Sequence, residues 1–135
     1  MSIEFRDFSR IVIRDIDRIA DTFLEEVGGE IEAQAKQNTK VKTGKTKGSW
    51  EHAYDSDKKE VQIGSRYQNA LWEELGTGIY ALNDNGRKTK WVYTPDGGKH
   101  FYATVGKKPR RMLWNAYTTL KNTIINEARR RFKNL

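Results

Sequence analysis

The segment NALWEELGTG, residues 69–78, places two adjacent carboxylates beside a tryptophan and just before a Gly-Thr-Gly run. Paired carboxylates such as Glu73 and Glu74 are the groups that glycosidases use as acid and as nucleophile or base. Neighbouring residues of a helix, however, point about 100° apart, so these two cannot converge on one bond of a substrate. An ion pair or exposure to solvent is therefore the better expectation for this pair than catalysis.

A second suggestive segment is TGKTKG, residues 43–48, because Gly44-Lys45-Thr46 matches the end of the phosphate-binding loop pattern. That pattern also requires a glycine five residues before Gly44, where this chain has Thr39. It should follow a strand and open a helix, whereas this segment follows a polar helix end and leads into a predicted strand. The sequence therefore favours a basic loop over nucleotide hydrolysis.

Residues that bind metals or act as nucleophiles are scarce. The chain has no cysteine, and its two histidines, His52 and His100, are predicted to lie in strands beside aromatic residues. Neither the His-Glu-His spacing of zinc enzymes nor the strained serine turn of hydrolases occurs. We expect no catalytic residue, no cofactor and no metal, and hence a protein that is not an enzyme.

Basic side chains gather in three groups, which makes nucleic acid a serious alternative partner. The groups are Lys40, Lys42, Lys45 and Lys47; Arg87, Lys88 and Lys90; and Lys107, Lys108, Arg110 and Arg111. Tyr93, Phe101 and Tyr102 lie on predicted neighbouring strands, where bases could stack on them. Against this, aromatic hairpins usually contribute to a core, basic loops are often simply solvated, and no known nucleic-acid-binding signature is present.

Composition predicts one domain with a modest core and a heavily charged surface. The chain has 135 residues, of which 36% are hydrophobic and 32% charged, and its net charge is +7. Residues 1–39 carry a net −4, and residues 40–135 carry +11. Such asymmetry points to a partner surface of opposite sign, either nucleic acid or another copy of the chain. No apolar run reaches transmembrane length and no signal-peptide pattern begins the chain, so we expect no membrane partner and a cytosolic site of synthesis.

The elements that must position these residues begin with a long helix over residues 8–38. Its apolar positions recur every three or four residues, which gives one stripe along the helix. They are Phe8, Val12, Ile16, Ile19, Phe23, Val27, Ile31 and Ala35. Gly28 and Gly29 interrupt the pattern, and since the stripe continues beyond them we expect a kink there rather than an end.

The remaining elements are two predicted strand pairs, a short helix between them and a closing helix. Residues 2–5 could form a further short strand. Residues 49–55 and 59–65 form the first pair, 66–75 the short helix that Gly76 ends, and 91–94 and 100–105 a hairpin around PDGGK. Pro109 suits the first turn of the closing helix. We predict one α+β domain over residues 1–135: a small antiparallel sheet with long N-terminal and C-terminal helices packed on it and one short helix between the strand pairs.

Taken in order, these segments resemble the bacteriophage neck and tail-completion family, the head–tail joining components of long-tailed phages and prophages. The first signature of that family reads V-D-T-G-x-L-x-x-S, which Val41, Thr43, Gly44 and Ser49 match, with Lys42 and Thr46 as departures. The second resembles Y-A-x-x-x-E-x-G-T, which Tyr67, Glu74, Gly76 and Thr77 match with looser spacing. Pro109 and Ala116 approximate the third, a P-x-x-x-x-A stretch near the last helix.

The resemblance implies a non-enzymatic virion protein of the head–tail junction, assembled in the host bacterial cytoplasm. It would form a homo-oligomeric ring, taken as sixfold, around the path of the phage DNA. Its partners would be the tail tube or tail terminator and the head connector, with DNA nearby but not specifically bound. The alternative is a small basic nucleic-acid-binding protein.

For such an assembly we expect the interface to contain Trp72, Glu74, Gly76, Thr77, Lys42, Lys45, Arg87, Arg110 and Arg111. Trp72 would be an aromatic anchor, and packing in the core is an equally good account of it. Gly76 would permit a left-handed turn at the helix end, and Gly78 a close approach to a neighbour. An acidic first helix and basic loops would complement each other between neighbouring copies.

Overall fold

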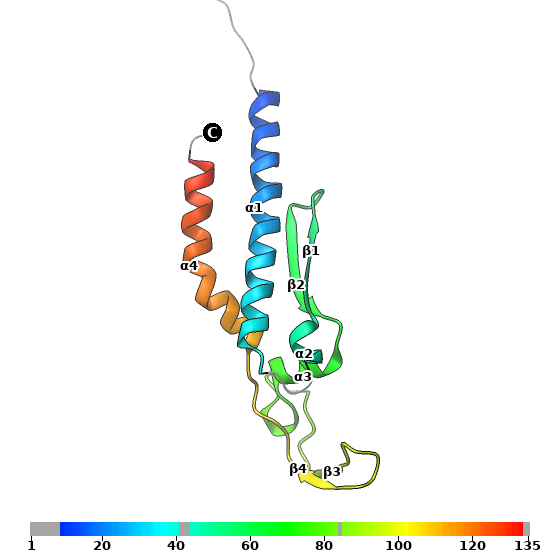
Figure 1. Cartoon of the computed structure of the whole chain (residues 1–135). Coiled ribbons are helices and arrows are strands. Elements are labelled where there is room, and N and C mark those ends of the chain that lie inside the picture. The colour runs from blue at the N-terminus through cyan, green and yellow to red at the C-terminus, as the bar shows by residue number, and fades with distance from the viewer. Residues whose placement is uncertain (1–8, 41–43, 84, 134–135) are drawn as a thin grey trace, which may run out of the picture.

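The helix α1 is the central column of the molecule, and Figure 1 shows the other elements arranged along it. The structure is a computed structural model that describes residues 9–40, 44–83 and 85–133. The elements are α1 (Ser9–Asn38), α2 (Lys45–Gly48), β1 (Trp50–Asp55), β2 (Glu60–Ser65), α3 (Gln68–Leu75), the 3₁₀ turn η1 (Gly78–Tyr80), β3 (Trp91–Tyr93), β4 (Tyr102–Thr104) and α4 (Met112–Phe132). The possible strand at residues 2–5 lies outside the described residues.

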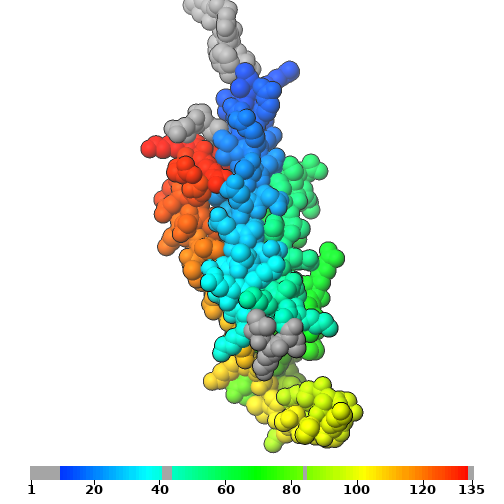
Figure 2. Space-filling view, viewed as in Figure 1, coloured from blue at the N-terminus to red at the C-terminus, as the bar shows by residue number. Residues whose placement is uncertain are grey.

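The predicted α+β class is confirmed, but the strands form two separate two-stranded antiparallel sheets instead of one. The β1–β2 hairpin packs on α1, and α4 also packs on α1 rather than on a sheet. Figure 1 shows these two on opposite sides of α1, while α2, α3 and the β3–β4 hairpin occupy one end. Figure 2 shows the resulting elongated molecule, with the yellow hairpin segment forming a knob at that end.

The core lies along the seam between α1 and α4 and widens where α3 and β1 join it. On α1 the buried apolar residues are Phe23, Val27, Ile31 and Ala35, which belong to the predicted stripe. Ala35, Ala70 and Ala116 come from three different helices and have no exposed surface, so small side chains let the helices approach closely. Trp50 is also buried, and its indole Nε1 donates to Thr39 Oγ1 at 2.9 Å, which satisfies its polar atom.

The kink expected at Gly28 and Gly29 is not found. α1 is one helix from Ser9 to Asn38, and Figure 1 shows it without a sharp bend. Gly28 is instead the point where the β1–β2 hairpin lies against the helix backbone. A Cβ on Gly28 would lie 2.6 Å from Val61 Cγ2 and 2.7 Å from His52 Cδ2, so the missing side chain makes room for the hairpin.

His52 of β1 holds the hairpin to α1 from the same place. Its Nε2 lies 2.8 Å from a Glu25 carboxylate oxygen and its Nδ1 lies 3.4 Å from Glu32. The hydrogen bond with Glu25 raises the pKa of His52 above the ordinary 6.5, Glu32 adds to the shift, and partial burial opposes it. His100, also predicted to lie in a strand, is in the turn before β4, where it contacts Asp96.

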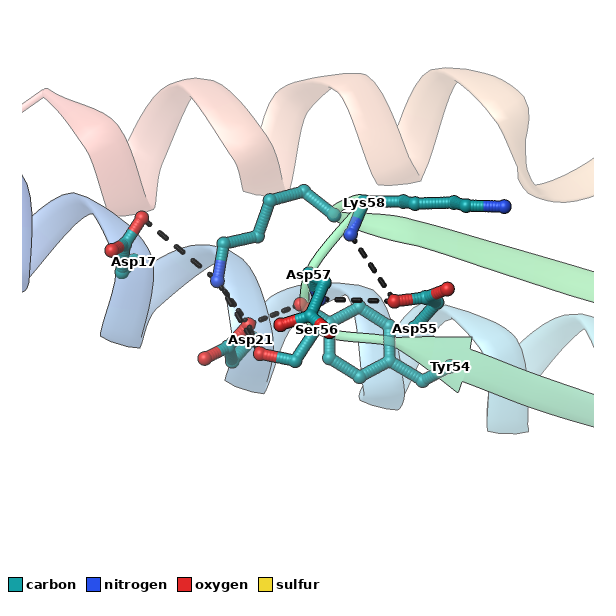
Figure 3. Close-up of polar contacts among 8 residues, drawn as sticks. Asp17, Asp21, Tyr54, Asp55, Ser56, Asp57 and Lys58 are labelled. Carbon is teal, nitrogen blue, oxygen red and sulfur yellow. Dashed lines mark hydrogen bonds and ion pairs between the residues drawn. The ribbon is translucent and has the colours of Figure 1, made fainter.

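The tip of the hairpin is attached to α1 by a second polar cluster, drawn in Figure 3. Asp21 of α1 accepts hydrogen bonds from Tyr54, from Ser56 at 3.0 Å and from Lys59 at 2.7 Å. Lys59 and Tyr54 are the main causes that lower the pKa of Asp21. The hairpin is therefore fixed to the acidic helix at two points along its length.

The far end of α4 is also tied to α1. Arg131 forms an ion pair with Glu26 of α1 and lies over the ring of Phe23, 5.4 Å from its centroid. Arg130 and Arg131 lower the pKa of Glu127 to about 2. α4 begins at Met112, three residues after Pro109, so the proline precedes the helix instead of opening it.

Replacing Gly28 by alanine is expected to destabilise the protein, while Gly29→Ala is expected to stabilise it. Both changes gain helix propensity, about 1 kcal/mol each. At Gly28 overpacking against Val61 costs about 1–3 kcal/mol, whereas the nearest atom to a Cβ on Gly29 is 3.9 Å away. Urea unfolding should therefore separate the two variants by about 2 kcal/mol. Equal stabilities would contradict the close packing at Gly28.

His52 should make stability depend on pH near neutrality. Because its pKa is raised in the folded state, its contribution is fully present below about pH 6.5 and is lost as pH rises through the raised pKa. We expect the advantage in unfolding free energy of the wild type over His52→Gln to shrink above pH 6.5. In a background with both Glu25→Gln and Glu32→Gln, the pH dependence of that advantage should disappear. If the pH dependence remained, these two carboxylates would not be the cause of the raised pKa of His52.

Candidate functional site

Glu74, expected at an interface, is buried and caps the helix α4. Its carboxylate accepts hydrogen bonds from the backbone N–H of Leu113 at 2.8 Å and of Trp114 at 3.0 Å. The first backbone amides of a helix lack partners within the helix, and the helix dipole favours negative charge there. The residue before α4 provides no side-chain cap, so a carboxylate from α3 does so. Glu74 therefore belongs to the fold and is not available to a neighbour.

Glu73 makes the ion pair that the sequence favoured over catalysis. Its carboxylate pairs with Lys107 and with Arg110, whose Nε lies 3.0 Å away. The backbone N–H of Arg110 also donates to the Glu73 carbonyl at 2.7 Å. Arg110, another predicted interface residue, is thus used partly to fix residues 107–110 against α3.

The Gly-Thr-Gly run lets residues 76–79 lie alongside residues 105–107. Gly76 has φ +78° and ψ 171°, so its φ is positive as predicted, but the backbone then continues extended rather than turning left-handed. The N–H of Thr77 donates to Lys107 O at 2.9 Å, and Thr77 Oγ1 accepts from Lys107 N at 2.9 Å. A Cβ on Gly78 would collide with the carbonyl of Val105, so the close approach expected with a neighbour occurs within the chain.

Between α3 and the face of the β3–β4 hairpin lies a groove of about 810 Å³, which we call the α3–β3 groove. Aromatic and aliphatic side chains line it from both elements: Leu71, Trp72 and Leu75 from α3, and Trp91 and Tyr93 from β3. Amide side chains also line it, namely those of Gln68, Asn69, Asn83 and Asn85. Trp72 is 51% exposed, so the anchor predicted there lies on the surface and not in the core.

Of the other residues predicted for the interface, one lines this groove and the rest lie elsewhere or outside the described residues. Arg87 lines the groove and lies over Trp91, 5.7 Å from the ring centroid. Arg111 lies outside it, over Trp114 at 5.3 Å, and has a left-handed backbone with φ 55°. Lys45 opens α2 and lies over Tyr67 at 5.6 Å. Lys42 lies outside the described residues.

Most of the exposed large apolar side chains of the described residues belong to the end of the molecule around the groove. We call it the apolar end surface, and its members are Leu71, Trp72, Ile79, Tyr80, Leu82, Val92, Tyr93, Phe101, Tyr102, Val105, Trp114 and Tyr117. Val92 and Phe101 are 64% and 67% exposed, so the aromatic hairpin is not the core element that its composition suggested. Large contiguous apolar surfaces on soluble domains mark interaction sites.

This same end carries most of the net charge. Residues 76–111 contain eight basic and two acidic side chains, a net +6 out of +7 for the chain. The acidic side of the charge split is largely used inside the protein, since Asp21, Glu25, Glu26 and Glu32 all contact basic or histidine side chains of the same chain. We expected the acidic first helix of one copy to pair with the basic loops of its neighbour. These four acidic residues already have partners in their own chain, which weakens that expectation.

Within the described ranges, no cluster of three or more histidine, cysteine, aspartate or glutamate side chains is placed to hold a metal ion. Glu73 and Glu74 point to different partners, as their adjacent positions on α3 predicted. Over the same ranges, no helix has the length and apolar character needed to cross a membrane.

Comparison of the chain with protein-family models, with curated proteins and with solved structures found no match. Trp72 and Arg87, both predicted for an interface, line the α3–β3 groove. The sequence analysis did not single out Trp91 as a further lining residue, although a tryptophan in a hairpin rich in aromatic residues was the available signal.

Glu74→Gln is expected to lower the unfolding free energy by about 1–2 kcal/mol, because the amide places its NH₂ group against one of the two donating N–H groups. Glu74→Ala should cost more, since both helix amides then lose their acceptor. Thermal and urea unfolding measure the effect. Glu30→Gln, on an exposed part of α1, is the control and should stay within about 0.5 kcal/mol of the wild type. If Glu74→Gln left the unfolding free energy unchanged, the capping role would be disproved.

Proposed function

We propose that this protein is a non-enzymatic structural component of the head–tail junction of a long-tailed bacteriophage. In this proposal it assembles into a ring around the DNA path and docks on the tail tube. The apolar end surface is the observation that carries the proposal: its exposed aromatic residues stand on a short hairpin that has little packing of its own. A two-stranded hairpin is marginally stable alone, and contact with another molecule would bury it.

The order of sequence signatures supports the same assignment. The residues that resemble the second signature, Glu74, Gly76 and Thr77, form the junction that holds α3, α4 and residues 105–107 together. A role in the fold explains why such a motif would recur in proteins that share this architecture. Assembly is then the task of the surface around the motif, with Trp72 and Arg87 as its central members.

Apolar contact has to provide most of the energy of such an interface. Exposed ion pairs contribute only about 0–1 kcal/mol each, and several acidic residues of α1 are already paired within the chain. Charge would instead select the partner and its orientation. The net +6 of residues 76–111 means that the partner of this end is acidic.

Binding of nucleic acid is the second candidate, and one observation favours it. Several cations lie over aromatic rings at this end, including Arg87 over Trp91 and Lys108 over Tyr80 at 5.9 Å. Interleaved cations and aromatic rings are what single-stranded nucleic acid binds. Such binding would weaken steeply with salt, and Arg87→Gln would reduce the slope of log affinity against log salt by about one.

Native mass spectrometry and co-sedimentation with purified tail tubes test the assembly proposal. We expect a closed oligomer, alone or on the tube, and its loss in a double variant Val92→Ser, Phe101→Ser. Both side chains are highly exposed, so the fold does not depend on them. Ile13→Ser, 58% exposed on α1 away from this end, is the control and should assemble normally. A chain that stays monomeric with its tail partners, yet binds single-stranded DNA tightly at moderate salt, would replace assembly with the second candidate.

A further inference from the structure

The α3–β3 groove differs from the rest of the apolar end surface because it has two walls and polar groups along its length. Leu71 and Trp72 of α3 and Trp91 and Tyr93 of β3 all line it. The walls come from separate elements that residues 76–79 and 105–107 hold in place through backbone hydrogen bonds. The groove is therefore formed within the single chain, and its lining residues need no second copy to bring them together.

The amide side chains in the groove indicate what backbone conformation an occupant would have. Gln68, Asn83 and Asn85 carry both donors and acceptors, and Asn69 carries the same groups but already donates from Nδ2 to Thr46 Oγ1 at 3.0 Å. An extended peptide needs such partners because its N–H and C=O groups have none of their own, whereas a helix satisfies them internally. Apolar side chains of the peptide would fill the space between the aromatic walls.

The charge around the groove indicates the sign of the occupant. Glu73 is the acidic residue among its described lining residues, and Lys107 and Arg110 neutralise it. Arg87 stands at the wall beside Trp91, within a segment whose net charge is +6. This positive charge repels the same end of a second copy of the protein and attracts an acidic peptide.

We propose that the α3–β3 groove binds an extended acidic peptide segment with aromatic or aliphatic anchor residues, supplied by another protein of the virion. The identity of the source as a virion protein rests on the proposed function. The groove favours a peptide over nucleic acid because apolar and amide groups line it, while Lys107 and Arg110 are occupied by Glu73. Trp72 is the anchor contact and Arg87 selects the acidic flank.

The test uses the full chain and fluorescence anisotropy of labelled synthetic peptides. The probe alternates Asp or Glu with Phe and Ile. One comparison peptide has Lys in place of every acid, another has Ser in place of every apolar residue, and oligothymidine is the competitor. We expect the probe to bind, both comparison peptides to bind at least about tenfold more weakly, and oligothymidine not to displace the probe. Failure of any of these three expectations overturns the proposal.

Two tryptophan variants provide the matched control. Trp72 and Trp114 are 51% and 50% exposed, but only Trp72 lines the groove. Trp72→Ala should weaken binding of the probe about tenfold, and Trp114→Ala should leave it within about twofold. Equal effects would place the peptide outside the groove. A chain that assembles on tail tubes but does not bind the probe would refute the groove and leave the proposed function standing, and the reverse result would refute only the proposed function.

Discussion

The capping of α4 by Glu74 is the contact on which the rest of the structure depends. One buried carboxylate, accepting from two backbone amides, joins α3 to the start of α4. The same junction receives the end of α1, since Asn38 donates to the Met112 carbonyl at 3.1 Å. A carboxylate at a helix N-terminus accepts hydrogen bonds from the helix amides and interacts favourably with the helix dipole. It therefore fixes both the distance and the orientation of α3 relative to the start of α4. With α3 held in this way, Trp72, which is two residues before Glu74 and so on the opposite face of the helix, is exposed to solvent.

Acidic and basic side chains have different partners at the two ends of the molecule. Acidic residues of α1 hold the other elements: Asp21 and Glu25 contact the hairpin β1–β2, and Glu26 contacts α4. At the opposite end Lys107 and Arg110 pair with Glu73, whereas Arg87 and Arg111 lie over aromatic rings. One end of the molecule is thus internally compensated, while the other keeps a positive surface that attracts acidic partners.

An apolar surface that is joined to the rest of the fold by backbone hydrogen bonds suits a protein that works by assembly. The exposed aromatic residues stand on α3 and on the β3–β4 hairpin, both anchored through residues 76–79 and 105–107. Anchoring lowers the entropy that binding would otherwise cost, and large aromatic side chains contribute most of the contact energy in interfaces. Apolar burial, with charge selecting the partner, is therefore the physical basis of the assembly that we propose.

The sequence by itself determined the local elements, since apolar spacing, Gly76 and the PDGGK turn are signals carried by neighbouring residues. It predicted the two long helices and both hairpins, and it left an ion pair or exposure to solvent open for Glu73. Only the tertiary structure decided that Gly28 accommodates a hairpin, that Glu74 caps another helix, and that the strands form two sheets. Those outcomes depend on contacts between residues far apart in the chain: Glu74 lies about forty residues from the amides it binds. The spacing of residues in the sequence determines local secondary structure. Contacts between residues far apart in the sequence are determined by how whole helices and strands pack together.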